Sequence, residues 1–156
     1  MAEMTRYKKI VVPVDGSRWS ERAIPHAVDI ARVNESELIL LHVLKPPASD
    51  YVGEIALAGQ NDQLMAVREE MKQKLMGLRG QIRSEKITVR VQMIEGLGVA
   101  GIIVDYINDE GADLVVMSSH GRTGLLRWML GSVAHKVMQE VRVPVMIIHP
   151  DKDEQS

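Results

Sequence analysis

The sequence lacks several features on which whole classes of protein depend. It contains no cysteine and no phenylalanine, and aromatic residues make up 3% of its 156 residues. Without cysteine there are no disulfide bonds, thiolate metal sites or cysteine nucleophile. The longest apolar run, Leu38 to Leu44, is interrupted by His42 and is far shorter than the roughly 20 residues of a membrane-spanning helix. Because residues 1–9 also lack the apolar core of a secretory signal, we expect a cytoplasmic protein without a membrane partner.

An excess of either charge is also missing. Nineteen lysines and arginines stand against twenty-one aspartates and glutamates, which gives a net charge of −2. A chain without excess positive charge is a poor ligand for a nucleic-acid backbone, so no nucleic-acid partner is predicted. The hydrophobic share of 46% and the charged share of 26% are typical of a folded globular protein. The length predicts one domain, placed at residues 1–150, followed by a polar tail at 151–156.

Short apolar runs alternate along the chain with segments of helical periodicity. The runs predict strands at 10–14, 38–44, 88–94, 114–117 and 145–148. Helices are predicted at about 20–33, 62–84, 102–107 and 133–141, with a small-residue loop at 49–60. This alternation predicts an α/β fold, a single doubly wound parallel sheet of five strands with helices on both faces, as in Rossmann-like proteins. Ligands of such sheets bind beyond the carboxyl ends of the strands, where the winding direction reverses.

Three residues carry smaller structural predictions. Ser17 follows the first strand and is placed to cap the helix after it. Met71 and Met138 fall on apolar helix faces, where flexible methionine side chains commonly fill gaps in a core. All three predictions concern folding and leave the function open.

The segment between the fourth strand and the fourth helix holds the most informative motif. Gly121 and Gly124 allow close approach of the backbone, and Gly131-Ser132 opens a helix whose free amides and positive dipole end attract an anion. These features are the ingredients of a phosphate site. The alternative is that the glycines form only a turn and a helix start, and composition alone does not separate the two interpretations.

Taken as a unit, this segment resembles the motif of the universal stress protein family. That motif has two glycines separated by two residues, then nine residues, then a glycine followed by serine or threonine. Here the frame falls on Ser118, Gly121, Gly131 and Ser132. Residues 12–17, 40–43 and 143–148 also resemble family landmarks, so the resemblance covers nearly the whole chain. It implies the strand order 3-2-1-4-5 and a binding site for ATP or another adenine nucleotide such as ADP or AMP, with Mg²⁺ as a further candidate.

The resemblance also implies roles for individual residues. Asp15 is expected to face the ribose or the metal–phosphate side, and the backbone of Val43 is expected to face adenine. Around these two residues, the implied site consists of Pro13, Val14, Met117, Ser118, His120, Gly121, Arg122, Gly131, Ser132 and Val133. His120 is expected to order the glycine loop by a hydrogen bond, and Arg122 could neutralise phosphate charge.

One position departs from the family motif. Ser118 stands where the motif has its first glycine, and its side chain either obstructs the ligand or replaces a lost contact with its hydroxyl. Two other functions therefore stay open: a nucleotide-free dimeric scaffold, and, less favoured, an ATP-dependent adenylating enzyme. No positioned base or nucleophile is evident, so binding is predicted instead of catalysis, and slow ATP hydrolysis is the most that is expected.

The strand predicted at 145–148 indicates that a second copy of the chain pairs with this one. In the implied order the fifth strand lies at the edge of the sheet, yet Val145, Met146, Ile147 and Ile148 carry none of the charges that usually protect an exposed edge. A second copy pairing with this strand about a two-fold axis would cover it, which is also the interface that the family resemblance implies. A homodimer through these four residues is predicted. The alternative is that the long second helix or the tail covers the edge.

Overall fold

A computed structural model describes residues 6–46, 54–82, 87–120 and 130–151 of the chain. Within them, five parallel strands form one sheet in the order β3-β2-β1-β4-β5, as predicted. The strands are β1 (Lys9–Pro13), β2 (Glu37–Leu44), β3 (Thr88–Glu95), β4 (Leu114–Ser118) and β5 (Val145–Ile148). The order reverses between β1 and β4, since the chain first winds outward to β3 and then returns to the other side of β1.

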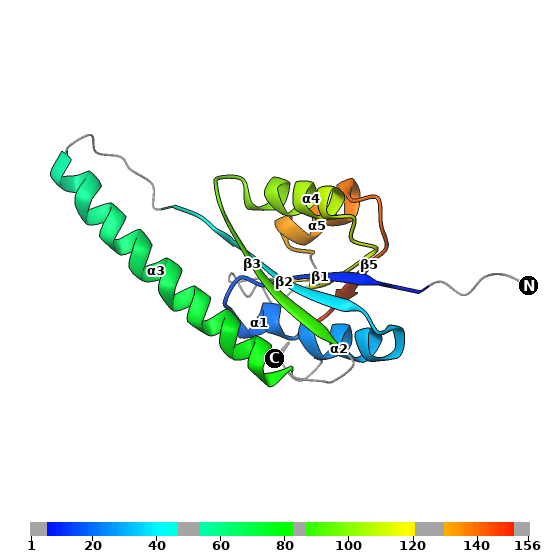
Figure 1. Cartoon of the computed structure of the whole chain (residues 1–156). Helices are drawn as coiled ribbons and strands as arrows, with labels where there is room; N and C mark the ends of the chain where they lie inside the picture. Colours follow the sequence, from blue (N-terminus) through cyan, green and yellow to red (C-terminus); the bar gives the residue numbers. More distant parts are fainter. Residues whose placement is uncertain (1–5, 47–53, 83–86, 121–129, 152–156) are drawn as a thin grey trace, which may run out of the picture.

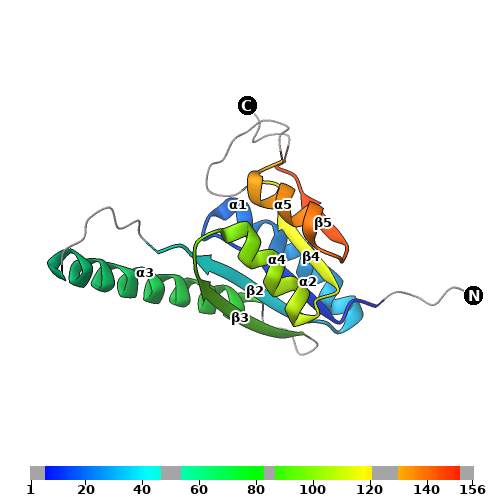
Figure 2. The same cartoon turned by 90° about the horizontal axis from the view of Figure 1, so that it is seen from above.

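Five helices cover the two faces of this sheet. They are α1 (Arg18–Glu21), α2 (Ala23–Asn34), α3 (Glu54–Gln81), α4 (Val99–Glu110) and α5 (Ser132–Glu140). In Figure 1, α4 and α5 lie over one face, while α1, α2 and α3 lie below the other. Figure 2, seen from above, shows α4 and α5 in front of the strands and α3 running outward past the sheet beside β3.

The two faces give the protein two apolar clusters separated by the sheet. Alternate residues of β1 divide between them: Ile10 and Val12 belong to the cluster under α2 and α3, and Val11 belongs to the one under α4 and α5. All three side chains are fully buried. A strand buried on both faces must be apolar at every position, which explains the unbroken apolar runs in the sequence.

The first predicted helix is two helices in the structure, with a break at Arg22. Pro25 explains the break, because proline has no N–H to bond the carbonyl group of Glu21 and its ring clashes with that group. Ser17 caps α1 as predicted, since its Oγ accepts a hydrogen bond from the Ser20 amide. The prediction of one continuous helix over 20–33 was therefore wrong only at its start.

The second correction concerns α3, which begins at Glu54 inside the segment predicted to be a loop. Five of the seven residues at 54–60 are good helix formers, namely two alanines with leucine, glutamate and glutamine, so local propensity favoured a helix over a loop. Met71 is buried as predicted, but the prediction of a buried Met138 was wrong: its side chain is 48% exposed on α5. In the part of the chain that the structure describes, no helix combines the length and apolar character needed to cross a membrane.

Candidate functional site

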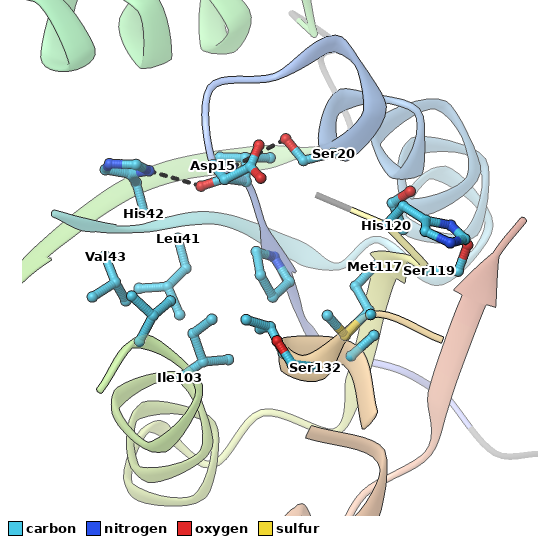
Figure 3. A pocket seen from close by; sticks show the side chains of 17 residues that line it. Asp15, Ser20, Leu41, His42, Val43, Ile103, Met117, Ser119, His120 and Ser132 are labelled. Atoms are coloured by element: carbon cyan, nitrogen blue, oxygen red, sulfur yellow. Dashed lines mark hydrogen bonds between the residues drawn. The ribbon is translucent and has the colours of Figure 1, made fainter. Parts of the chain in front are cut away.

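A cavity of about 210 Å³ opens beyond the carboxyl ends of β1 and β4, where the winding of the sheet reverses. Figure 3 shows the side chains that line it. Ten of the twelve residues in the predicted site lie together on its wall: Pro13, Val14, Asp15, Val43, Met117, Ser118, His120, Gly131, Ser132 and Val133. The other two, Gly121 and Arg122, lie outside the described residues. Four separate segments of the chain thus meet at the place where doubly wound sheets bind ligands.

The turn after β1 positions Asp15 at this cavity. Gly16 follows with φ of 89°, a left-handed conformation that glycine adopts without steric cost. Oδ1 of Asp15 accepts hydrogen bonds from the backbone N–H and the hydroxyl of Ser17, as aspartate commonly does in turns. The Asp15 amide donates to Oγ of Ser20 at 3.1 Å. The carboxylate is therefore fixed at the cavity by its own turn.

The backbone of Val43 faces the cavity because β1 ends before it reaches the level of Val43. Val14 N donates to Leu41 O at 2.8 Å, just beyond the last paired residues of the two strands, Pro13 and Leu41. Alternate residues of a parallel strand direct their N–H and C=O groups to the same neighbour, so Val43 directs both toward the β1 side. The chain turns away after Val14, and no described residue of β1 lies opposite Val43. The cavity wall thus presents one donor and one acceptor at this point.

The amino-terminal end of α5 forms the opposite wall. Its cap residue, Gly131, provides no side-chain hydrogen bond to the first turn, and the Gly131 carbonyl accepts from His135 N at 2.9 Å. The first amides of α5 and the positive end of its dipole consequently face the cavity without a side-chain cap, which suits an anion.

Gly131 is required here by packing, since its φ of −61° is open to any residue. A Cβ atom at this position would lie 2.9 Å from the carbonyl oxygen of Ser119, which is a backbone atom that cannot easily move away. The Gly131 amide donates to the same oxygen at 2.8 Å. This close contact joins the start of α5 to the end of β4.

Ser119 and His120 form a buried polar pair at the end of β4. Ser119 Oγ lies 2.9 Å from His120 Nδ1, and the two residues are 1% and 8% exposed. Ser119 N also donates to Ile148 O at 3.0 Å, which ties the pair to β5. Ser118, the residue that departs from the motif, is buried beside them at the cavity wall. Its place there leaves both interpretations of its hydroxyl open.

The sequence interpretation missed part of the cavity wall. Ser20, Leu41, His42, Val99, Ile103, Ser119 and Ala134 also line it. Val99 and Ile103 stand four residues apart at the start of α4, a spacing that puts both on one helix face. That spacing, together with the glycine before the helix, was a signal that sequence reasoning could have used.

The wall is mostly apolar, and Asp15 is the one carboxylate among the described lining residues. No cluster of three or more metal-ligating side chains occurs in the described parts of the chain. The cavity therefore suits a ligand with an apolar ring at one end and a negative group at the other.

Comparison with known proteins agrees with this architecture. Residues 6–149 match the model of the universal stress protein family. The chain is 34% identical over 148 residues to universal stress protein MJ0531 of Methanocaldococcus jannaschii, covering 95% of this chain and 85% of that protein. The solved structure of MJ0577 from the same organism is 30% identical, with a TM-score of 0.81 and coverage of 95% and 99%.

A third comparison concerns a structure solved with a ligand. It is described as a universal stress protein in complex with cAMP; it is 25% identical, has a TM-score of 0.60 and covers 94% of this chain and 100% of its own. The family match spans nearly the whole chain and includes every strand of the sheet. The chain belongs to the universal stress protein family.

Proposed function

We propose that this protein binds ATP, or another adenine nucleotide, in the cavity beyond β1 and β4. The observation that carries the proposal is the convergence of ten residues of the predicted site, from four segments of the chain, on the wall of one cavity. A related universal stress protein has been solved with cAMP, which supports an adenine ligand for this chain as well.

Each part of the proposed ligand has a matching part of the wall. The N–H and C=O groups of Val43 pair with the polar edge of adenine, while Leu41, Ile103 and Met117 surround its ring. The Asp15 carboxylate accepts hydrogen bonds from ribose hydroxyls, and the uncapped start of α5 holds phosphate oxygens. Asp15 is also the described lining group that could share a Mg²⁺ ion with those phosphates.

We also propose that the protein acts as a nucleotide-dependent homodimer paired through Val145, Met146, Ile147 and Ile148. Met146 is 39% exposed on this edge strand, whereas Val145 and Ile147 pack against the cluster under α4 and α5. Ser119 supports a link between the two properties, because it bonds both Ile148 of β5 and Gly131 at the start of α5. A nucleotide that prefers one arrangement of this segment would bias the dimer surface as well.

Calorimetric titration of the purified protein with ATP and Mg²⁺ tests the binding proposal. We expect one site per chain, and native mass spectrometry should find an adenine nucleotide carried through purification. Absence of binding heat at saturating ATP would favour the nucleotide-free scaffold. Phosphate release should be far slower than the ordinary enzyme range of about 1 to 10³ per second, since the sequence indicates no positioned general base or nucleophile.

A further inference from the structure

We infer that His42 is a positioning residue of the nucleotide site, holding the turn that places Asp15 at the cavity. The inference rests on the proposed function and deepens it, since it names a residue of the cavity wall that acts on the ligand through Asp15. His42 lies near the carboxyl end of β2 and is 4% exposed. Leu38 and Leu40 belong to the cluster under α2 and α3, so alternation points the His42 ring toward that face of the sheet.

The ring makes a hydrogen bond to the turn. His42 Nδ1 lies 2.8 Å from Val14 O, and Figure 3 shows this bond beside Asp15. A carbonyl oxygen only accepts, so Nδ1 carries a hydrogen and donates. This bond is compatible with both the neutral Nδ1–H tautomer and the charged ring, so protonation of His42 does not break it.

Val14 is thereby held to β2 at both of its polar groups. Its N–H donates to Leu41 O at 2.8 Å, and its C=O accepts from the side chain of the very next residue of β2. The peptide bond after Val14 leads directly into Asp15, whose amide is fixed by Ser20. Val14, at the start of the turn, is therefore held by β2, and the Asp15 amide that follows is held by Ser20 of α1.

A purely structural explanation also exists, in which His42 satisfies one buried carbonyl group and does nothing else. Its position in the sequence argues for more. Leucine at 42 would complete the apolar run of β2, whereas a buried histidine ring costs free energy unless it is hydrogen-bonded, as His42 is to Val14 O. The carbonyl that it binds belongs to the residue immediately before the one carboxylate of the described wall.

The test is a double-mutant cycle between His42→Leu and Asp15→Ala, read by calorimetric titration with ATP. His42→Leu alone should weaken binding by between about twofold and tenfold, the range that one hydrogen bond supplies. In the Asp15→Ala background the same change should alter the dissociation constant by less than twofold, because His42 acts through Asp15. An equal loss in both backgrounds would overturn the inference, and so would wild-type affinity in folded His42→Leu.

His42→Asn is the matched control, because its amide nitrogen lies near the position of Nδ1 and still donates to Val14 O. It should retain wild-type affinity, and a loss as large as that of the leucine variant would overturn the role of this bond. Should His42→Leu not fold, His42→Gln replaces it, since its amide lies nearer the position of Nε2 and misses Val14 O.

Hydrogen exchange of the Asp15 amide, measured without nucleotide, separates failure of the inference from failure of the proposed function. Exchange should be faster in His42→Leu than in wild type and His42→Asn. Unchanged exchange would overturn the inference even if ATP binds. A wild type that binds no adenine nucleotide would refute the proposed function, and with it the functional role of His42, whatever the exchange rates.

Discussion

The two ends of this one sheet are built in opposite ways. At the amino ends of the strands, Arg90 of β3 bonds Glu37 of β2 at 2.7 Å and Glu110 at the end of α4, and Lys9 of β1 donates to Glu110 as well. Asp113 accepts from the backbone of Lys9. Charges of opposite sign therefore join β1, β2, β3 and α4 at this end.

At the carboxyl ends, Arg68 of α3 pairs with Glu95 on the outer strand β3, whereas a cavity opens beyond β1 and β4. The wall of the cavity offers the backbone of Val43, the first amides of α5 and the single carboxylate of Asp15. Among the described residues, an ion-pair network therefore joins β1, β2, β3 and α4 at one end of the sheet, while the other end contains the cavity. We call the first the closed end and the second the open end.

Three groups with shifted pKa values lie at the closed end. The hydrogen bond from Arg90 lowers the pKa of Glu110, and the bond to Glu110 raises the pKa of Arg90. Burial raises the pKa of Tyr106, which lies beside this cluster on α4. Perturbed pKa values often mark catalytic sites, but here they mark an ion-pair network that lies away from the cavity.

The largest effect is expected from Gly131→Ala at the open end. The new Cβ atom would meet Ser119 O at 2.9 Å and push the start of α5 away from β4, so ATP binding should fall below detection by calorimetry. Gly101→Ala on α4 is the matched control, because its nearest contact would be Lys136 Nζ at 3.8 Å. It should keep ATP affinity and raise the free energy of unfolding by about 1 kcal/mol. Equal binding by both variants would remove Gly131 from the site.

The next effect in size is expected from Asp15→Ala. Losing hydrogen bonds from a charged group should weaken ATP binding by about 10- to 100-fold in calorimetric titrations. Asp15→Asn separates charge from turn geometry, since it keeps an oxygen that accepts from Ser17. We expect Asn to bind ATP less tightly than wild type and more tightly than Ala. Wild-type ATP affinity in Asp15→Ala would contradict this prediction, because the cavity would then bind ATP without the Asp15 carboxylate.

Both the fold and most of the open end could be predicted from the sequence. Alternating apolar runs and helical periods predicted a doubly wound parallel sheet, whereas the strand order and the place where Asp15 and Ser118 meet were implied by the family resemblance. Hydrogen bonds between side chains of one strand and the backbone of its neighbour were harder to predict from the sequence. Nothing near His42 in the sequence indicates that its ring reaches Val14, because that contact depends on the register of β1 against β2.

The ion-pair end was not predicted at all, for a similar reason. Arg90 and Glu37 are 53 residues apart in sequence, and a strand predicted at 88–94 does not by itself indicate which carboxylate Arg90 meets. The break at Arg22 and the start of α3 were missed for local reasons, namely the effect of Pro25 and the helix propensity of residues 54–60. Sequence patterns thus located most helices and strands, whereas the polar contacts between them depend on which residues the strand register places side by side.

The edge strand β5 provides a smaller and separate effect. Met146→Lys places a charge at the exposed position of the proposed dimer interface and should raise the dimer dissociation constant about tenfold, measured by sedimentation equilibrium. Ile147 is unsuitable for this test because its side chain packs in the core. Val33→Lys, at a residue 85% exposed near the end of α2, is the control and should leave association unchanged. A monomeric wild type at micromolar concentration would contradict the dimer.

The smallest effect is expected from Glu110→Gln at the closed end. Its side chain is 23% exposed, so removing its partly screened ion pairs should lower the free energy of unfolding by about 0.5–1 kcal/mol at pH 7. Because the folded-state pKa of Glu110 is lowered, this contribution is complete above the unfolded pKa of about 4.3 and is lost as pH falls through the folded value. Urea unfolding at pH 7 and pH 3 should therefore show that the difference in the free energy of unfolding between wild type and Glu110→Gln becomes smaller at pH 3.

Asp109→Asn is the control, since Asp109 is an exposed neighbour on the same helix without an ion pair among the described residues, and it should show no such pH dependence. ATP affinity should be equal in all three proteins; a weaker affinity in Glu110→Gln would mean that the two ends of the sheet do not act independently.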